Sequence, residues 1–174
     1  MQFCQLDRIT ELVPGEKLVA VKNLSLSEDY LQDHFPRFPV MPGVLMLEAM
    51  FQAGMFLIYA TQDFQHSSVV LKESKQVKFG DFVEPGSQLT VIAEWNKTDE
   101  NQVLMVTQGL INGNVAVKGR LLLEYFNLAT RELGTKAADE FLIQERIKQF
   151  RRLQDPRNPY NSAFNDGTVA SSNG

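Results

Sequence analysis

The chain has 174 residues, of which 44% are apolar and 22% charged, a net charge of −4, and one cysteine. This profile fits a single globular domain with an appendage, and the acidic balance argues against nucleic acid as the main partner. Cys4 has no partner for an internal disulfide and no C-x-x-C spacing for zinc, which is typical of a reducing cytoplasm.

The first third of the chain predicts a hairpin followed by an extended loop. Residues 5–26 alternate loosely around a turn at Pro14-Gly15, which indicates two strands. Ser27 is expected to cap a short helical turn that ends near Tyr30. Three prolines between positions 36 and 42 then keep the backbone out of helix.

A long helix is predicted from Pro42-Gly43 to about Thr61, because proline suits the first turn. It is apolar nearly all round, so most of its surface should be buried. Its longest apolar run, 44–60, is interrupted by polar residues and is shorter than the roughly 20 residues of a membrane span. We therefore expect a core helix and no membrane span, and no secretory signal is visible at the N-terminus.

The rest of the first 126 residues carries strand patterns. Asn112-Gly113 is a strong hairpin signal between two of them. Two strands, one buried helix and four further strands predict an α+β domain with a mostly antiparallel sheet. The expected later strands are Val69–Phe79, Gln88–Trp95, Val103–Ile111 and Val115–Phe126.

Composition divides the chain into three parts. Residues 1–126 form the main domain, and 127–154 form a helical extension with an amphipathic pattern. Residues 155–174 have little to bury and are expected to be disordered. The helix should pack on the main domain or on a neighbouring protomer through an apolar stripe of Ile143, Ile147, Phe150 and Leu153.

Four residues around the start of the helix could carry chemistry. A charged residue in a buried helix costs several kcal/mol unless it is paired or neutralised, which makes Glu48 a functional candidate. Gln52 lies four residues on, on the same face. His34 can act as a base near neutral pH, and the unpaired N–H of Gly43 can polarise a carbonyl. By composition alone, a histidine beside Phe and Pro is more often structural than catalytic, and Gly43 could serve the turn alone.

A base, an acid and a carbonyl clamp suit proton abstraction next to a carbonyl followed by loss of a β-hydroxyl. A protonated carboxylic acid in a dry pocket is a competent general acid. The residues by themselves suggest a dehydration reaction, and we expect it to need no metal or organic cofactor.

A longer motif resembles a known family. It reads His34-Phe35-Pro36-x-x-Pro39-Val40-Met41-Pro42-Gly43, then Leu47-Glu48-Ala49-Met50-x-Gln52, and it is similar to the signature of the hot-dog-fold 3-hydroxyacyl-(acyl carrier protein) dehydratases. The resemblance extends from about Leu6 to Phe126 and includes Val77-Lys78-Phe79. Glu at position 48 resembles the branch that only dehydrates.

The resemblance implies a hot-dog fold, in which a sheet wraps around one long buried helix. It implies that His34 is the base at C2, that Glu48 is the acid at the C3 hydroxyl, and that Gly43, Gln52 and Phe79 bind substrate. The two catalytic side chains would come from different protomers of a homodimer, or of a hexamer built as a trimer of dimers. Acyl carrier protein would deliver the substrate in cytoplasmic fatty-acid or related acyl-chain synthesis.

Three features depart from the family's pattern. Arg37-Phe38 stands where the family has Gly-His, Met1–Leu6 replaces the family's N-terminal stretch, and Asn127–Gly174 has no counterpart. A hot-dog thioesterase that positions water with Glu48 is one alternative. The Arg37-Phe38 pair and the added C-terminal segment keep open another, a non-catalytic acyl- or carrier-binding protein. An acidic carrier needs a basic docking site, and the candidates are Arg37, Lys72, Lys75, Lys78, Lys118 and Arg120, with Arg146, Arg151 and Arg152 in the extension.

Overall fold

The computed structural model describes residues 3–35 and 37–154. The main domain contains one long helix, α1 (Gly43–Thr61), and a short 3-10 turn, η1 (Asp29–Leu31). A second turn, η2 (Ala129–Arg131), leads into the C-terminal helix α2 (Lys136–Leu153). The strands are β1 (Arg8–Val13), β2 (Lys17–Asn23), β3 (Ser68–Phe79), β4 (Gln88–Asp99), β5 (Gln102–Ile111) and β6 (Asn114–Phe126).

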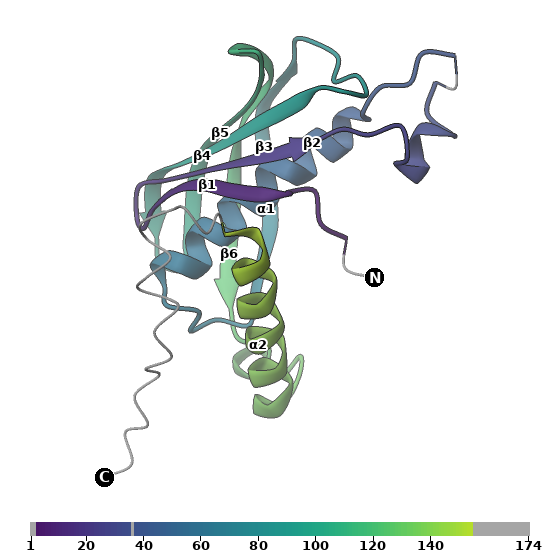
Figure 1. Ribbon diagram of the computed structural model, residues 1–174. Coiled ribbons are helices and arrows are strands. Elements are labelled where there is room, and N and C mark those ends of the chain that lie inside the picture. Colours follow the sequence, from purple (N-terminus) through teal and green to yellow (C-terminus); the bar gives the residue numbers. More distant parts are fainter. Residues whose placement is uncertain (1–2, 36, 155–174) are drawn as a thin grey trace.

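The strands form one antiparallel sheet in the order β1-β2-β4-β5-β6-β3, and the sheet curves around α1 (Figure 1). Alternate side chains point inward, as period-2 alternation requires. Leu18 and Ala20 of β2 and Val91 and Ala93 of β4 are fully buried in this way. This is the α+β hot-dog arrangement, so the predicted fold class is confirmed.

The helix α1 is the centre of the core. By length and hydropathy it could cross a membrane, but 67% of its apolar window is buried inside the protein. Its apolar surface is thus used by packing against the sheet. Its bounds, Gly43–Thr61, agree with those predicted from the sequence.

Local sequence signals predicted most strands correctly, but they gave the wrong end for β4 and the wrong cap for η1. At the β5–β6 turn, Asn112 and Gly113 both have positive φ (50° and 83°), which is the conformation that a two-residue hairpin requires. β4 extends four residues beyond the expected Trp95, past a register shift between Trp95 and Lys97. The predicted Ser27 cap is wrong, because its hydroxyl hydrogen-bonds the Ser25 hydroxyl (2.9 Å).

The predicted C-terminal helix is present and packs on the main domain. Phe150 is 1% exposed, and its ring centroid lies 5.9 Å from that of Phe56 and 5.3 Å from that of Phe64. Leu153 is buried too, and Ile143 and Ile147 pack against the same core. The predicted stripe is confirmed as an anchor to the body. The three-part division remains a prediction, and its tail, 155–174, lies outside the described residues.

Hydrogen bonds fix the start of the extension. The Asp139 carboxylate accepts from the backbone N–H groups of Leu128 (2.8 Å) and Ala129 (3.0 Å). A hydrogen bond with the Ser67 side chain, followed by these two, lowers the pKa of Asp139 below its ordinary value. The carboxylate thereby ties α2 to the segment that leaves β6.

Candidate active site

His34 lies in the loop between η1 and α1, and both its backbone and its ring are hydrogen-bonded to backbone carbonyls. Its backbone N–H donates to the Tyr30 carbonyl (3.1 Å), and its ring Nδ1 lies 3.2 Å from the Val40 carbonyl oxygen. A carbonyl only accepts, so this hydrogen bond places the proton of a neutral ring on Nδ1. The other nitrogen, Nε2, is left as an acceptor, which is the form a general base needs.

The loop residues after His34 are partly apolar and exposed. Phe35 packs edge-on against the His34 ring, and Phe38 packs edge-on against Phe82, with ring centroids 5.5 Å apart. Phe35, Phe38 and Phe82 are 60%, 49% and 59% exposed. The Phe38 of the unusual Arg37-Phe38 pair therefore contributes to an exposed aromatic cluster beside His34.

Gly43 is needed for a close approach. A Cβ at this position would lie 2.9 Å from Cε1 of Phe79, the last residue of β3. Gly43 begins α1, and its N–H is among the first four of a helix, which have no partner within the helix. The Phe79 ring therefore packs directly on Gly43, which brings together two of the predicted substrate-binding residues.

Glu48 lies one and a half turns into α1 and is half-buried. Gln52 donates from Nε2 to Glu48 Oε1 at 2.8 Å, which confirms that the two share a face. The Gln52 amide is itself fixed, since Nε2 also donates to the Phe3 carbonyl (3.2 Å) and Oε1 accepts from the Gln5 N–H (2.8 Å). Gln52 is only 3% exposed. These contacts fix the Gln52 amide against the Glu48 carboxylate, while the substrate-binding role of Gln52 stays a prediction.

The segment Phe3–Leu6 thus supports the site, a role that the sequence did not reveal. In the sequence, this segment stands out only as a departure from the family pattern. Its hydrogen bonds run from the backbone to Gln52, 47 and 49 residues away, and backbone groups leave no residue-type signal.

Glu48 opens onto a cavity of about 440 Å³ between α1 and α2. Phe3, Phe51, Gln52 and Met55 line it beside Glu48. The other wall is the extension helix, through Phe141, Leu142, Glu145, Arg146 and Gln149. Of these, only Arg146 was singled out from the sequence, as a carrier contact.

His34 and Glu48 do not meet within one chain. His34 is not among the residues that line the Glu48 cavity, and no hydrogen bond or ion pair joins the two side chains in the part of the chain that the structure describes. Gly43 and Phe79 lie near the His34 loop, and Gln52 lies with Glu48. Within residues 3–35 and 37–154, no three His, Cys, Asp or Glu side chains gather as metal ligands.

Known proteins similar to this chain match over the main domain. Residues 1–125 match the FabA-like domain family model. A 3-hydroxyacyl-(acyl-carrier-protein) dehydratase FabZ from Levilactobacillus brevis is 37% identical over 116 residues, which cover 67% of this chain and 78% of the relative. A dehydratase of the same name from Ruminiclostridium cellulolyticum is 36% identical over 119 residues, 68% of this chain and 84% of the relative.

Solved structures agree on the fold. A chain of the dehydratase heterocomplex ApeI:P from Xenorhabdus doucetiae has a TM-score of 0.59 at 17% identity, covering 80% of this chain and 89% of its own. The PaaI protein of E. coli has a TM-score of 0.53 at 10% identity, covering 68% and 78%. The family match, the identity to full-length relatives and the hot-dog architecture together establish that this chain belongs to the FabA-like dehydratase family.

Proposed function

We propose that this protein dehydrates 3-hydroxyacyl thioesters on acyl carrier protein to trans-2-enoyl thioesters, in fatty-acid or related acyl-chain synthesis. The observation that carries the proposal is the His34 ring, whose Nδ1 is engaged by the Val40 carbonyl so that Nε2 is a ready base, within a FabA-like chain. The relatives from L. brevis and R. cellulolyticum are both named as 3-hydroxyacyl-(acyl-carrier-protein) dehydratases.

The reaction needs one proton removed and one supplied. His34 Nε2 takes the proton from C2 of the (3R)-hydroxyacyl group, while the Gly43 N–H stabilises negative charge on the thioester oxygen. Protonated Glu48 donates to the C3 hydroxyl, the C3–O bond breaks, and water leaves as the C2–C3 double bond forms. Proton exchange with solvent then restores the neutral imidazole and the carboxylic acid.

Gln52 orients the acid in this scheme. Its Nε2 hydrogen bond occupies Glu48 Oε1, so Oε2 is the oxygen that serves the substrate. Because the Gln52 amide is held by two backbone groups, the carboxyl orientation is fixed before substrate binds.

We place His34 and Glu48 of one site on two protomers. The two side chains do not meet within one chain, and the His34 loop is surrounded by exposed apolar side chains, a composition that marks an interface. These are Phe35, Phe38, Val44, Phe79 and Phe82, each 49–68% exposed. The edge strand β3, twelve residues long and mostly exposed, offers backbone groups for pairing with a second copy.

Mixing two inactive variants tests the shared site. His34→Ala and Glu48→Gln homodimers should each be inactive, and after subunit exchange about half of the dimers are mixed, each with one complete site. Activity should return to about a quarter of the wild-type rate. A mixture that stays inactive although subunit exchange is shown by mass would place both residues of each site in one chain.

A basic strip on the outer face of the sheet suits the acidic carrier. Lys75 of β3 lies directly opposite Arg120 of β6, and Lys78 lies opposite Lys118. Like charges in such pairs are unfavourable unless an anion compensates them. Lys75 reaches Glu73 (2.8 Å), whereas no ion pair joins Lys78, Lys118 or Arg120 to another described residue.

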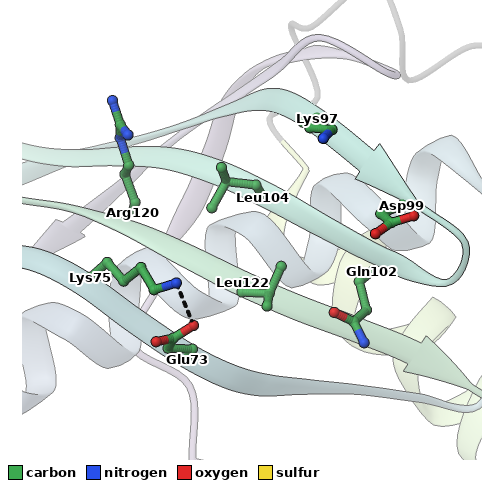
Figure 2. A pocket seen from close by; sticks show the side chains of 8 residues that line it. All are labelled: Glu73, Lys75, Lys97, Asp99, Gln102, Leu104, Arg120 and Leu122. Carbon is green, nitrogen blue, oxygen red and sulfur yellow. Dashed lines mark ion pairs between the residues drawn. The ribbon is translucent and has the colours of Figure 1, made fainter.

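The strip borders two shallow surface cavities that also expose apolar side chains. One is lined by the basic residues Lys75, Lys97 and Arg120, by the acidic residues Glu73 and Asp99, and by Gln102, Leu104 and Leu122 (Figure 2). The next, which includes Lys78, Lys118 and Val106, has no acidic residue among the described residues that line it. Lys78 directly precedes Phe79, which packs over Gly43. A carrier bound here by complementary charge would thus sit next to the His34 side of the site.

Replacing the strip's charge tests the carrier contact. Lys78→Glu with Lys118→Glu should raise KM for carrier-linked substrate by about tenfold or more, with the difference shrinking at high salt. The same variant should act normally on a pantetheine thioester, which lacks the protein carrier. Lys136→Glu with Arg152→Glu, which makes the same change in net charge at two exposed positions of α2, is the control. A KM for carrier-linked substrate that stays at the wild-type value in the strip variant would contradict this docking site.

The activity itself is tested with purified protein and a 3-hydroxyacyl carrier thioester. We expect enoyl absorbance to rise without release of free thiol, and we expect Glu48→Gln to abolish it. Thiol release without enoyl product would identify a thioesterase instead. Binding of the acyl carrier without any turnover would identify a non-catalytic binding protein.

A further inference from the structure

The extension helix α2 has a second face in addition to its anchor. The anchor face, with Ile143, Ile147 and Phe150, packs on the core. Residues at positions 142, 145, 146 and 149 are spaced as one helical stripe and line the Glu48 cavity. The α1 residues at positions 48, 51, 52 and 55 have the same spacing and form the opposite wall. Two helix faces therefore enclose the space into which Glu48 opens.

This wall lies outside the part of the chain that matches the family model, which ends at residue 125. The cavity is therefore built partly by residues that the family domain does not supply. Two of its aromatic side chains, Phe3 and Phe141, are 60% and 64% exposed. A ligand that covers them would remove that apolar area from water, which favours binding.

Arg146 makes one part of the wall polar. Its Nη1 donates to Gln149 Oε1 (2.9 Å), and it also hydrogen-bonds the side chain of Tyr59, whose pKa is raised chiefly by burial. No ion pair joins Arg146 to any described residue. A guanidinium held in this way is costly to cover with methylene groups, because they offer it no hydrogen bond.

We propose that the acyl tail of the substrate binds between α1 and α2, and that α2 selects the tail. Phe141 and Leu142 supply apolar contact, and Arg146 discriminates against long saturated tails. This inference rests on the proposed function, since Glu48 must meet C3 of the acyl group for the tail to enter its cavity. It makes Arg146 a specificity-determining residue in a part of the chain added to the family domain.

Two variants of the full chain test the selection by kinetics. Arg146→Met removes the charge and leaves Tyr59 satisfied, because its hydroxyl donates to the Ser67 carbonyl (3.2 Å). We expect its ratio of kcat/KM for dodecanoyl-length to butanoyl-length 3-hydroxy substrates to rise about tenfold or more over wild type. Arg152→Met, the same change at an exposed position of α2 that is outside the cavity lining, should leave the ratio unchanged. The same ratio of kcat/KM for dodecanoyl-length to butanoyl-length substrates in wild type and both variants would overturn the inference.

A second measurement does not depend on turnover. A pantetheine amide of a saturated fatty acid that carries a diazirine near its end is bound to wild-type protein, irradiated and mapped by mass spectrometry. We expect adducts on residues 141–149, and loss of labelling when unmodified acyl pantetheine competes. Labelling confined to other segments would refute the inference. If wild-type protein fails to dehydrate any thioester but labels α2, the proposed function fails and the acyl cavity stands.

Discussion

The Gln52 hydrogen bonds lead to a specific prediction, because this one amide links the N-terminal segment to Glu48, the proposed catalytic acid. Gln52→Met keeps the length of the side chain and removes three hydrogen bonds, to Glu48, Phe3 and Gln5. Methionine is flexible and apolar, so it fills the space without overpacking.

Losing the three hydrogen bonds of Gln52 should cost different amounts of folding stability. Phe3 is 60% exposed and Glu48 is half-buried, so water can replace Gln52 at both. Gln5 is 4% exposed, and its N–H would be left unpaired in the interior. An orphaned buried donor costs about 1–3 kcal/mol, so we expect the free energy of unfolding to fall by that amount. Loss of the fixed acid should lower kcat about 10- to 100-fold with little change in KM.

Urea unfolding and initial rates on a 3-hydroxyacyl carrier thioester measure the two effects. Tyr125→Phe is the matched control, because it removes one hydrogen bond of a buried side chain (Tyr125 hydroxyl to the Glu100 carbonyl, 3.2 Å) and Tyr125 lines neither the Glu48 cavity nor the cavities of the basic strip. It should cost about 1 kcal/mol of stability and leave kcat unchanged. If Gln52→Met were as active as Tyr125→Phe, Gln52 would be structural only, and the positioning role would be refuted.

Three further predictions concern packing, pH and the start of α1. Phe150→Ala should lower the free energy of unfolding by about 3–5 kcal/mol in urea, whereas Phe141→Ala at an exposed site should cost about 0.5 kcal/mol or less; equal losses would contradict the anchor role. The pKa of Asp139 is lower in the folded than in the unfolded protein, so its stabilisation is complete above its ordinary value of 3.8 and is lost as pH falls through the folded pKa. The stability difference between wild type and Asp139→Asn, followed by thermal unfolding from about pH 6 to about pH 2, should therefore shrink only at the acid end; a constant difference would refute the assignment. Gly43→Ala should displace the Phe79 ring and lower kcat/KM about tenfold, and the effect should be much smaller in a Phe79→Ala background; equal effects in both backgrounds would show that the ring is not the cause.

Local sequence patterns determined the elements and the catalytic candidates of this protein. The Asn112-Gly113 turn and the start of α1 at Gly43 depend on torsion angles and hydrogen bonds within a few residues, so a short window contains their cause. The same holds for Glu48 and Gln52, which share a helix face because of their spacing. The family motif then indicated the reaction.

Only the tertiary structure decided what surrounds those candidates. The Gln52 amide is fixed by the backbone of residues 3 and 5, and the Glu48 cavity is closed by α2, about a hundred residues further along the chain. Within α2, periodicity revealed the anchor stripe, whereas the polar stripe around Arg146 looked like an ordinary solvated face. Its role depends on which surface α2 packs against. Such long-range placement follows from the packing of the whole core, and no local pattern contains it.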